Sequence, residues 1–170
     1  SPHPIRLFDI DGDGRPEMVD PRGCFQLCEA TQWLVYDAEA NGFTAAPRPY
    51  AVPSHVACNG LTRPSEQRAR WMDFTLDGVP DVLTADLEGD RWILDRGTDT
   101  GVEPGIELPT PTIADLPLVG VHSYSGDPVQ FDIVALDESR PPALVVTARP
   151  DDPDVGQLHW EVYPFECAGP

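Results

Sequence analysis

The chain has 170 residues, of which 29 are acidic and 11 are basic, giving a formal net charge of −18 at pH 7. Such a charge repels a phosphate backbone, so nucleic acid is a poor partner and cations or basic surfaces are better ones. No stretch approaches the roughly 20 apolar residues that a bilayer-spanning helix needs, and we expect no membrane insertion. The length suits one domain, or a few small repeats that share a core.

The 20 prolines and 14 glycines argue against long helices and favour short strands joined by turns. The first strands expected along the chain are Ile5–Phe8, Glu17–Val19 and Gln32–Tyr36. A turn at Asn41-Gly42, where φ must be positive, leads to a fourth segment over Phe43–Ala46. No stretch keeps a period of 3.6 residues for long, so the predicted class is all-β.

The same plan recurs further along the chain. The stretch "FDIDGDGRPEMV" (residues 8–19) aligns without a gap on "MDFTLDGVPDVL" (residues 72–83), at an offset of 64 residues. An eroded third copy, "FDIVALDESRPPALVV" (residues 131–146), keeps Asp132 in place of the first loop aspartate and also keeps Asp137, but it loses the glycines. The pattern indicates an internal repeat.

A tryptophan opens a β-prone strand downstream of each copy: "WLVY" at Trp33, "WILD" at Trp92 and "WEVY" at Trp160. Two markers in the same order three times indicate three repeats with a period of about 60 residues. Because the tryptophans recur at one place in each repeat, we expect them to pack in the core. The predicted repeats, which together form one domain, cover residues 1–66, 67–127 and 128–170.

Four short strands in each repeat suggest the blades of a β-propeller, in which every blade stacks on its neighbours to bury its faces. Three blades are fewer than the usual four to eight. We therefore expect an incomplete ring, which belongs to a longer protein or which a homo-oligomer completes. A β-sandwich of the same strands is the alternative fold.

The stretch "DIDGDGRPE" places four carboxylates and two glycines within residues 9–17. A hard cation such as Ca²⁺ takes six to eight oxygen ligands, and alternate side chains converge once the backbone turns at the glycines. The predicted calcium ligands are Asp9, Asp11, Asp13, Arg15 through its carbonyl, and Glu17. Two other interpretations remain: a solvated acidic turn, because Asp and Gly are ordinary turn residues, and a catalytic pair, which a single tight loop disfavours.

The spacing also matches the first part of an EF-hand loop, but the flanking residues exclude the two helices of that motif. Pro2 and Pro4 precede the loop, Pro16 lies inside it, and Pro21 follows it. Proline at these positions prevents an entering or an exiting helix. The loop is therefore predicted to join two strands.

The stretch "FDIDGDGRPEMV", followed by "WLVYDAEANGF", resembles a repeat of the FG-GAP/VCBS type found in integrin-like β-propellers and many secreted bacterial proteins. In that family the acidic loop joins the first two strands of a blade and binds Ca²⁺, and a Gly-Phe pair, here Gly42-Phe43, ends the repeat. The resemblance is strong over residues 7–43, moderate over 71–95 and weak over 131–163. It implies calcium at the same five positions.

The second copy departs from this pattern, since Thr75 replaces the second aspartate and Leu76 replaces a glycine. Asp73, Asp77 and Asp81 remain, and they predict a second, weaker calcium site. The third copy lacks both the glycines and the closing acid, and no ion is expected there.

The four cysteines suggest an exported protein with disulfides, and the first pairing to consider is Cys24 with Cys28 and Cys58 with Cys167. The alternative is a zinc site in which Cys24, Cys28 and Cys58 join His55.

The sequence thus predicts a secreted or surface-exposed, calcium-stabilised β-repeat module that acts by binding or adhesion. Its expected partner is an extracellular protein or glycan, and no catalytic constellation is found. The alternative function is a carbohydrate-binding or accessory part of a polysaccharide-active enzyme.

Overall fold

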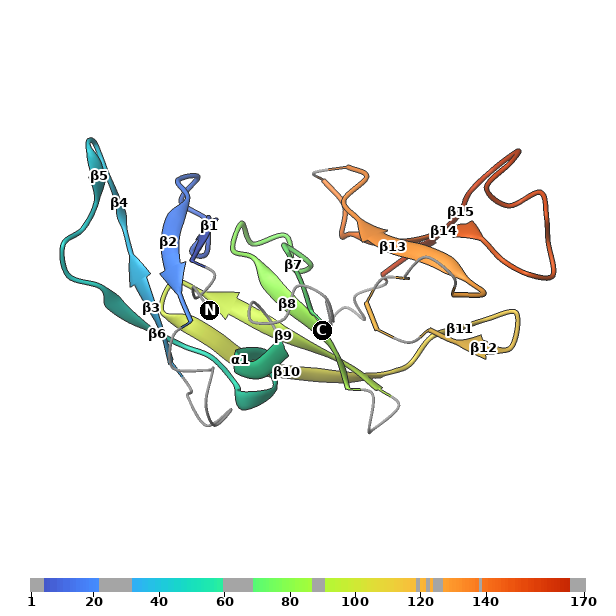
Figure 1. Cartoon of the computed structure of the whole chain (residues 1–170), viewed down its shortest axis with the longest axis horizontal. Coiled ribbons are helices and arrows are strands. Elements are labelled where there is room, and N and C mark those ends of the chain that lie inside the picture. The colour runs from blue at the N-terminus through green and yellow to red at the C-terminus, as the bar shows by residue number, and fades with distance from the viewer. Residues whose placement is uncertain are drawn as a thin grey trace.

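A computed structural model describes residues 5–21, 32–59, 69–86, 91–118, 120–121, 123, 127–137 and 139–165 (Figure 1). The regular secondary structure of this part of the chain is almost entirely β, which confirms the predicted class. Its one helix, α1 (Ser54–Asn59), has six residues. Within the described ranges, no helix has the length and apolar character to cross a membrane.

The strands, in chain order, are β1 (Arg6–Phe8), β2 (Glu17–Asp20), β3 (Gln32–Tyr36), β4 (Ala38–Glu39), β5 (Gly42–Phe43), β6 (Arg48–Ala51), β7 (Ala69–Met72), β8 (Asp81–Asp86), β9 (Arg91–Thr98), β10 (Gly101–Pro109), β11 (Thr112–Ile113), β12 (Leu116–Pro117), β13 (Gln130–Val134), β14 (Ala143–Ala148) and β15 (Glu161–Pro164).

Most strands belong to a curled eight-stranded sheet with the order β1-β2-β3-β6-β10-β9-β8-β7. It consists of two antiparallel groups of four strands, β1-β2-β3-β6 (the first group) and β7-β8-β9-β10 (the second group). The two groups meet where β6 and β10 run parallel, at the pair Ala51 and Gly101. A separate antiparallel sheet, β13-β14-β15, forms the third group. Figure 1 shows the three groups following one another from left to right.

The strand register relates the first two groups as the sequence alignment predicts. Phe8 lies opposite Glu17 at the end of the β1–β2 hairpin, and Met72 lies opposite Asp81 at the end of the β7–β8 hairpin, 64 residues later in both strands. Each hairpin encloses one of the acidic loops. The two loops therefore occupy equivalent places in the two groups.

The third group corrects the predicted alignment. Val134 lies opposite Ala143 in the β13–β14 hairpin, so Val134 corresponds to Phe8 at an offset of 126 residues. Asp132, which the sequence comparison placed in the third loop, is instead a residue of strand β13. The comparison followed a Phe-Asp pair that recurs by coincidence, because the glycines that mark the true loop are lost.

Two hydrophobic clusters lie between successive strand groups. The first packs Val19, Trp33 and Tyr50 of the first group against Val82 and Trp71 of the second. Trp71 meets the rings of Trp33 and Phe8 at centroid distances of 5.5 Å. Burial of each such large side chain contributes about 1.5–3 kcal/mol. These contacts fix the first group on one face of the second.

The second cluster packs Phe74, Leu83 and Trp92 of the second group against Phe131 and Leu144 of the third. The middle group is therefore covered on both faces. In strand β8 this explains why residues 81–85 are all buried, with Val82 in one cluster and its neighbour Leu83 in the other.

Two predictions about individual elements were wrong. The fourth strand of the first group is β6, not Phe43–Ala46, because Gly42-Phe43 turns back to pair with Ala38-Glu39 in a small ribbon. Trp33 and Trp92 are 0% and 1% exposed, as predicted, but Trp160 is 64% exposed.

Candidate metal centre

The first acidic loop is folded around the side chain of Asp9. The Asp9 carboxylate accepts hydrogen bonds from the backbone amides of Gly12 and Gly14, at 2.9 and 3.0 Å. The two glycines have φ angles of 76° and 85°, in the left-handed region that residues with a Cβ rarely adopt. The glycines thus give the loop its tight turn, and the turn brings the following carboxylates back toward Asp9.

Carboxylate oxygens of Asp9, Asp11 and Glu17 lie within 4.8 Å of one another. Glu17 is the buried member, with 2% of its surface exposed, and it accepts a hydrogen bond of 3.0 Å from the amide of Ile10. An all-oxygen set of this kind, held by a loop that turns at glycines, has the donor chemistry that Ca²⁺ prefers. The structure therefore brings together three of the five predicted ligands.

Burial and crowding both act on the ionisation of this cluster. Burial raises the pKa of Glu17 despite the hydrogen bond from Ile10, and the negative charges of Asp11, Asp13 and Asp9 raise it further. Burial is also the main cause of a raised pKa at Asp11, although Arg48 opposes it. A divalent cation would relieve the same repulsion that these shifts record.

The other two predicted ligands are in the same loop but outside this converging group. Asp13 is exposed and accepts a 2.8 Å hydrogen bond from the amide of Arg15, which closes a local turn. The contribution of Asp13 and of the Arg15 carbonyl to a cation site remains a prediction.

Arg48 reaches the cluster from strand β6. Its Nη2 donates to Asp11 Oδ2 at 2.7 Å, its Nε donates to Asp37 at 2.7 Å, and its Nη1 donates to the carbonyl of Asp99 at 2.7 Å. The guanidinium thus compensates part of the charge of Asp11 and connects the loop to two other segments. A bound cation would share Asp11 with this arginine.

The second acidic loop has the same shape and a different set of partners. Asp73 accepts hydrogen bonds from the amides of Asp77 and Gly78, as Asp9 does in the first loop. The buried Asp81 accepts from the backbone amides of three residues, namely Phe74, Thr75 and Gly97, at 2.9 Å each.

Asp77 pairs with Arg96 at 2.8 Å, and this contact lowers the pKa of Asp77 although burial on its own would raise it. Asp73, Asp77 and Asp81 are all described, yet they are not among the acidic groups whose oxygens converge. Backbone amides and one arginine thus supply much of the positive partner charge that an ion would supply. The weaker second site stays a prediction.

The two loops are in contact with each other. A Cβ atom placed on Gly12 would lie 2.0 Å from the carbonyl oxygen of Gly78. The backbone of the first loop therefore packs directly on that of the second, and a side chain at position 12 has no room. A change of shape in one loop is transmitted by contact to the other.

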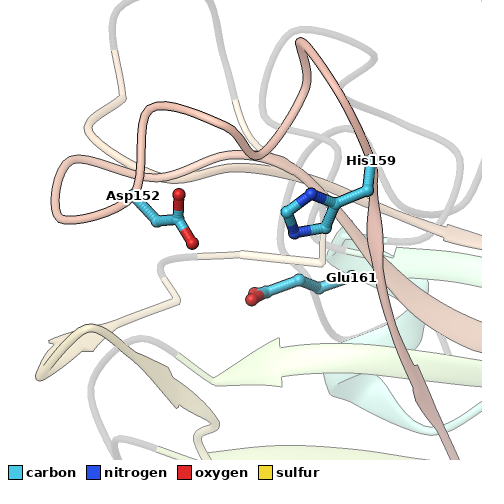
Figure 2. Close-up of side chains that lie close together, drawn as sticks. All are labelled: Asp152, His159 and Glu161. Carbon is cyan, nitrogen blue, oxygen red and sulfur yellow. The ribbon is translucent and has the colours of Figure 1, made fainter.

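A second converging group, which the sequence interpretation missed, lies in the segment between β14 and β15 and at the start of β15. Figure 2 shows Asp152, His159 and Glu161 with their side chains directed toward one another, and their ligand atoms lie within 4.8 Å. The alternation His159-x-Glu161 places both side chains on one side of the chain, and this was the available signal. However, Arg149 Nη2 lies 3.5 Å from Asp152 and 3.3 Å from Glu161. The group already surrounds a cation, and we interpret it as an ion-pair network.

The cysteine predictions fall outside what the structure describes. Cys24, Cys28 and Cys167 lie beyond the described residues, and so does the side chain of Cys58. Of the zinc alternative, only the His55 side chain is described. Its Nε2 forms a 2.6 Å hydrogen bond with Asp95 Oδ2, so this nitrogen already has a protein partner.

Comparison with known proteins adds no further assignment. No protein-family model matches this chain, and no curated protein sequence matches it. The candidate site is therefore defined by its own geometry: three converging carboxylates, one of them buried, on a hairpin loop that turns at glycines.

Proposed function

We propose that the chain is a calcium-binding β-repeat module of the FG-GAP/VCBS type, in which Ca²⁺ at the first acidic loop is structural. The observation that carries the proposal is the convergence of Asp9, Asp11 and Glu17 oxygens within 4.8 Å. The loop that presents them joins two antiparallel strands, as in that repeat family.

The role proposed for the ion follows from the position of the loop. Calcium there would neutralise part of the charge on the three converging carboxylates and would fix the end of the β1–β2 hairpin. Because the loop touches the second loop through Gly12 and Gly78, the ion would also stabilise the contact between the first two strand groups. The stacked strand groups support interpretation as propeller-type repeats.

A calcium site whose Asp9 and Asp11 carboxylates are only partly buried suits a compartment rich in calcium, so we propose that the module is secreted or surface-exposed. There it would act by binding an extracellular protein or glycan. The net charge of −18 favours cationic surfaces or cation-bridged contacts over polyanions.

The carbohydrate-binding alternative has less support. The apolar cavity between the second and third groups, of about 310 Å³, is lined by Trp92, Tyr163 and Phe165 together with prolines and leucines. Trp92 is 1% exposed, so it offers no open ring face for a sugar. We therefore assign this cavity to packing between the groups.

The proposal is tested by thermal unfolding in EDTA, in Mg²⁺ and in Ca²⁺. Binding to the folded state alone stabilises it by about 2.7 kcal/mol at 100 times the dissociation constant, so a calcium-selective rise in Tm is expected. Asp11→Asn should reduce the rise, because it removes the charge of a ligand and leaves a single oxygen donor. The matched control is Asp137→Asn, because Asp137 occupies the equivalent place in the third hairpin loop. Equal melting curves in EDTA and in millimolar Ca²⁺ would rule the proposal out.

A further inference from the structure

Exposed apolar side chains gather on the two outermost faces of the row of strand groups. Among the described residues, eleven large apolar side chains are exposed, and six of them lie on these two faces. The front face belongs to the first group and carries Ile5, Leu7 and Leu34. The rear face belongs to the third group and carries Leu136, Trp160 and Val162. The inference drawn from these faces does not depend on calcium binding at the metal centre.

The rear face repeats the pattern of the buried faces. Val162 lies opposite Val145 in the third group, just as Val35 lies opposite Val19 in the first. A tryptophan precedes the valine by two residues in each case, so Trp160 occupies the position of Trp33. In the second group the same position is that of Trp92.

The three equivalent tryptophans differ in whether another strand group packs on them. Trp33 is 0% exposed because the second group covers it, and Trp92 is 1% exposed because the third group covers it. Trp160 is 64% exposed and belongs to neither cluster. Trp160, for which the predicted burial was wrong, is thus the one of these three tryptophans on which no described strand group packs.

Leu136 gives the same result independently. It follows the end of β13 by two residues, as Ile10 follows the end of β1 and Phe74 follows the end of β7. Ile10 and Phe74 are both 0% exposed, in the two inter-group clusters, whereas Leu136 is 58% exposed. Two separate positions on the rear face are therefore built for burial.

The front face is the matching half of such a contact. Leu7 corresponds by register to Trp71 in the second group and to Ile133 in the third, and both of these pack against the preceding group. Leu7 itself is 65% exposed. Ile5 corresponds to Phe131, which is 5% exposed. The described part of the chain thus contains two complete interfaces of one kind and the two separate halves of a third.

Among the described strand residues, the acidic side chains that the register places on the two faces are buried or paired. The side chains on the front face alternate with those that face the second group, and the acidic one among them, Asp20, is 1% exposed. On the rear face Asp132 is paired with Arg70. Strand faces with so little exposed charge stand out on a protein of net charge −18, and an apolar contact between them is favourable.

We propose that the rear face of one copy of this chain docks on the front face of a second copy, head to tail. The second copy is the partner because it carries the half-interface that each face lacks. Two copies bring six strand groups, which is within the range of four to eight blades that close a propeller ring. If the rotation closes, both contacts form at once and the assembly is a dimer.

The test is the mass of the full chain in solution, measured by light scattering and sedimentation over a range of concentrations. The wild-type protein should have twice the mass of the chain. Leu7→Asp and Trp160→Asp should each give monomers, because each destroys one half of every contact. Mixing the two variants should restore a dimer, since the intact rear face of one then meets the intact front face of the other. Ile106→Asp, at a 58% exposed position of the second group, is the control and should leave the dimer intact.

Three results would overturn the proposal. A wild-type monomer at every concentration would show that another partner, or further strand groups of a longer protein, covers these faces. Loss of the dimer in Leu7→Asp alone, without rescue by mixing, would mean that two front faces meet. Loss of the dimer in Ile106→Asp would show that dimer formation does not depend specifically on the front and rear faces. Circular dichroism checks that each variant folds, and Leu7→Gln with Trp160→Gln replaces any pair that does not.

Discussion

Glu17 accepts a 3.0 Å hydrogen bond from the backbone amide of Ile10, and this contact closes the first acidic loop at its base. The same contact recurs in the second loop, where Asp81 accepts a 2.9 Å hydrogen bond from Phe74. The two buried carboxylates differ in the rest of their surroundings. Asp81 has further amide donors in Thr75 and Gly97, whereas Glu17 lies among other carboxylates. Backbone dipoles stabilise the charge of Asp81, whereas in the proposed function a bound cation would stabilise that of Glu17.

The first prediction contrasts the two acids by amide substitution. Glu17→Gln keeps an oxygen for the Ile10 amide and removes a repelled charge, so the calcium-free protein should be as stable as wild type or more stable. In Asp81→Asn an amide NH2 group, which is a donor, replaces an oxygen that accepts from backbone N–H groups. The free energy of unfolding should therefore fall by about 1–3 kcal/mol, with or without calcium. Urea unfolding in EDTA and in Ca²⁺ measures both. A calcium response that survives in Glu17→Gln would contradict the assignment of Glu17.

The second prediction concerns the contact between the loops. Gly12→Ala places a Cβ 2.0 Å from the Gly78 carbonyl oxygen, so the loops must separate and stability should fall by several kcal/mol. Gly14→Ala is the matched control, because Gly14 also has a positive φ but no heavy atom within 4 Å of the added Cβ. It should cost only about 1–2 kcal/mol of backbone strain. Thermal unfolding of the two variants in EDTA compares them, and equal losses would show that the contact is unimportant.

The sequence was sufficient for the features that depend on local chemistry. The aspartates and glycines of the first loop predict its turn, and the 64-residue offset predicts the register of the second hairpin. The tryptophan of β3 is predicted to be buried, and Trp33 is 0% exposed. These features are set by residues close to one another in the chain.

The sequence was not sufficient where distant segments decide the outcome. Arg48 and Arg96 approach the loops from other strands, and no local pattern marks them as partners of Asp11 and Asp77. The exposure of Trp160 depends on what covers a whole face of a strand group, not on the strand that bears it. Equivalence between the repeats predicts which positions are suited to burial. It does not predict on which of them another strand group of the same chain packs.

The third prediction concerns His55 on helix α1. Its ring is 2.6 Å from the carboxylate of Asp95, a residue that is 0% exposed and that also accepts a hydrogen bond from Gly105. His55→Ala leaves that buried carboxylate with one partner fewer, and stability should fall by about 1–3 kcal/mol. His159→Ala, at an exposed position, should change stability much less. Chemical denaturation measures both, and equal effects would argue against a specific role for the His55–Asp95 contact.

The fourth prediction concerns competition between Arg48 and calcium for Asp11. Arg48→Gln removes a positive charge that lies 2.7 Å from a predicted ligand, so calcium should bind more tightly, by about 1 kcal/mol or roughly fivefold in Kd. The same change should lower the stability of the calcium-free protein, because the contacts with Asp37 and Asp99 are lost as well. Isothermal titration calorimetry gives the affinity. The control is Arg96→Gln, at the second loop, which should leave the affinity of the first site unchanged. Weaker calcium binding in Arg48→Gln would show that Arg48 positions Asp11 instead of competing with calcium for it.

The fifth prediction concerns pH. Burial, followed by the charges of Asp11, Asp13 and Asp9, raises the pKa of Glu17 above its ordinary value in the calcium-free fold. Between the ordinary and the raised pKa the folded protein binds more protons than the unfolded chain, so this group makes the calcium-free protein more stable as the pH falls through that window. Calcium binds the ionised carboxylate of Glu17. The stabilising effect of calcium must therefore shrink as the pH falls through the same window.

The measurement is Tm against pH, from neutrality to about pH 4, in EDTA and in Ca²⁺. The two curves should lie far apart at neutral pH and converge as Glu17 takes up its proton. In Glu17→Gln they should already coincide at neutral pH, because this variant has lost the ionising group. A calcium-dependent gap that stays constant down to the ordinary carboxyl pKa would show that Glu17 is not a ligand and that the stabilising ion is bound elsewhere on the protein.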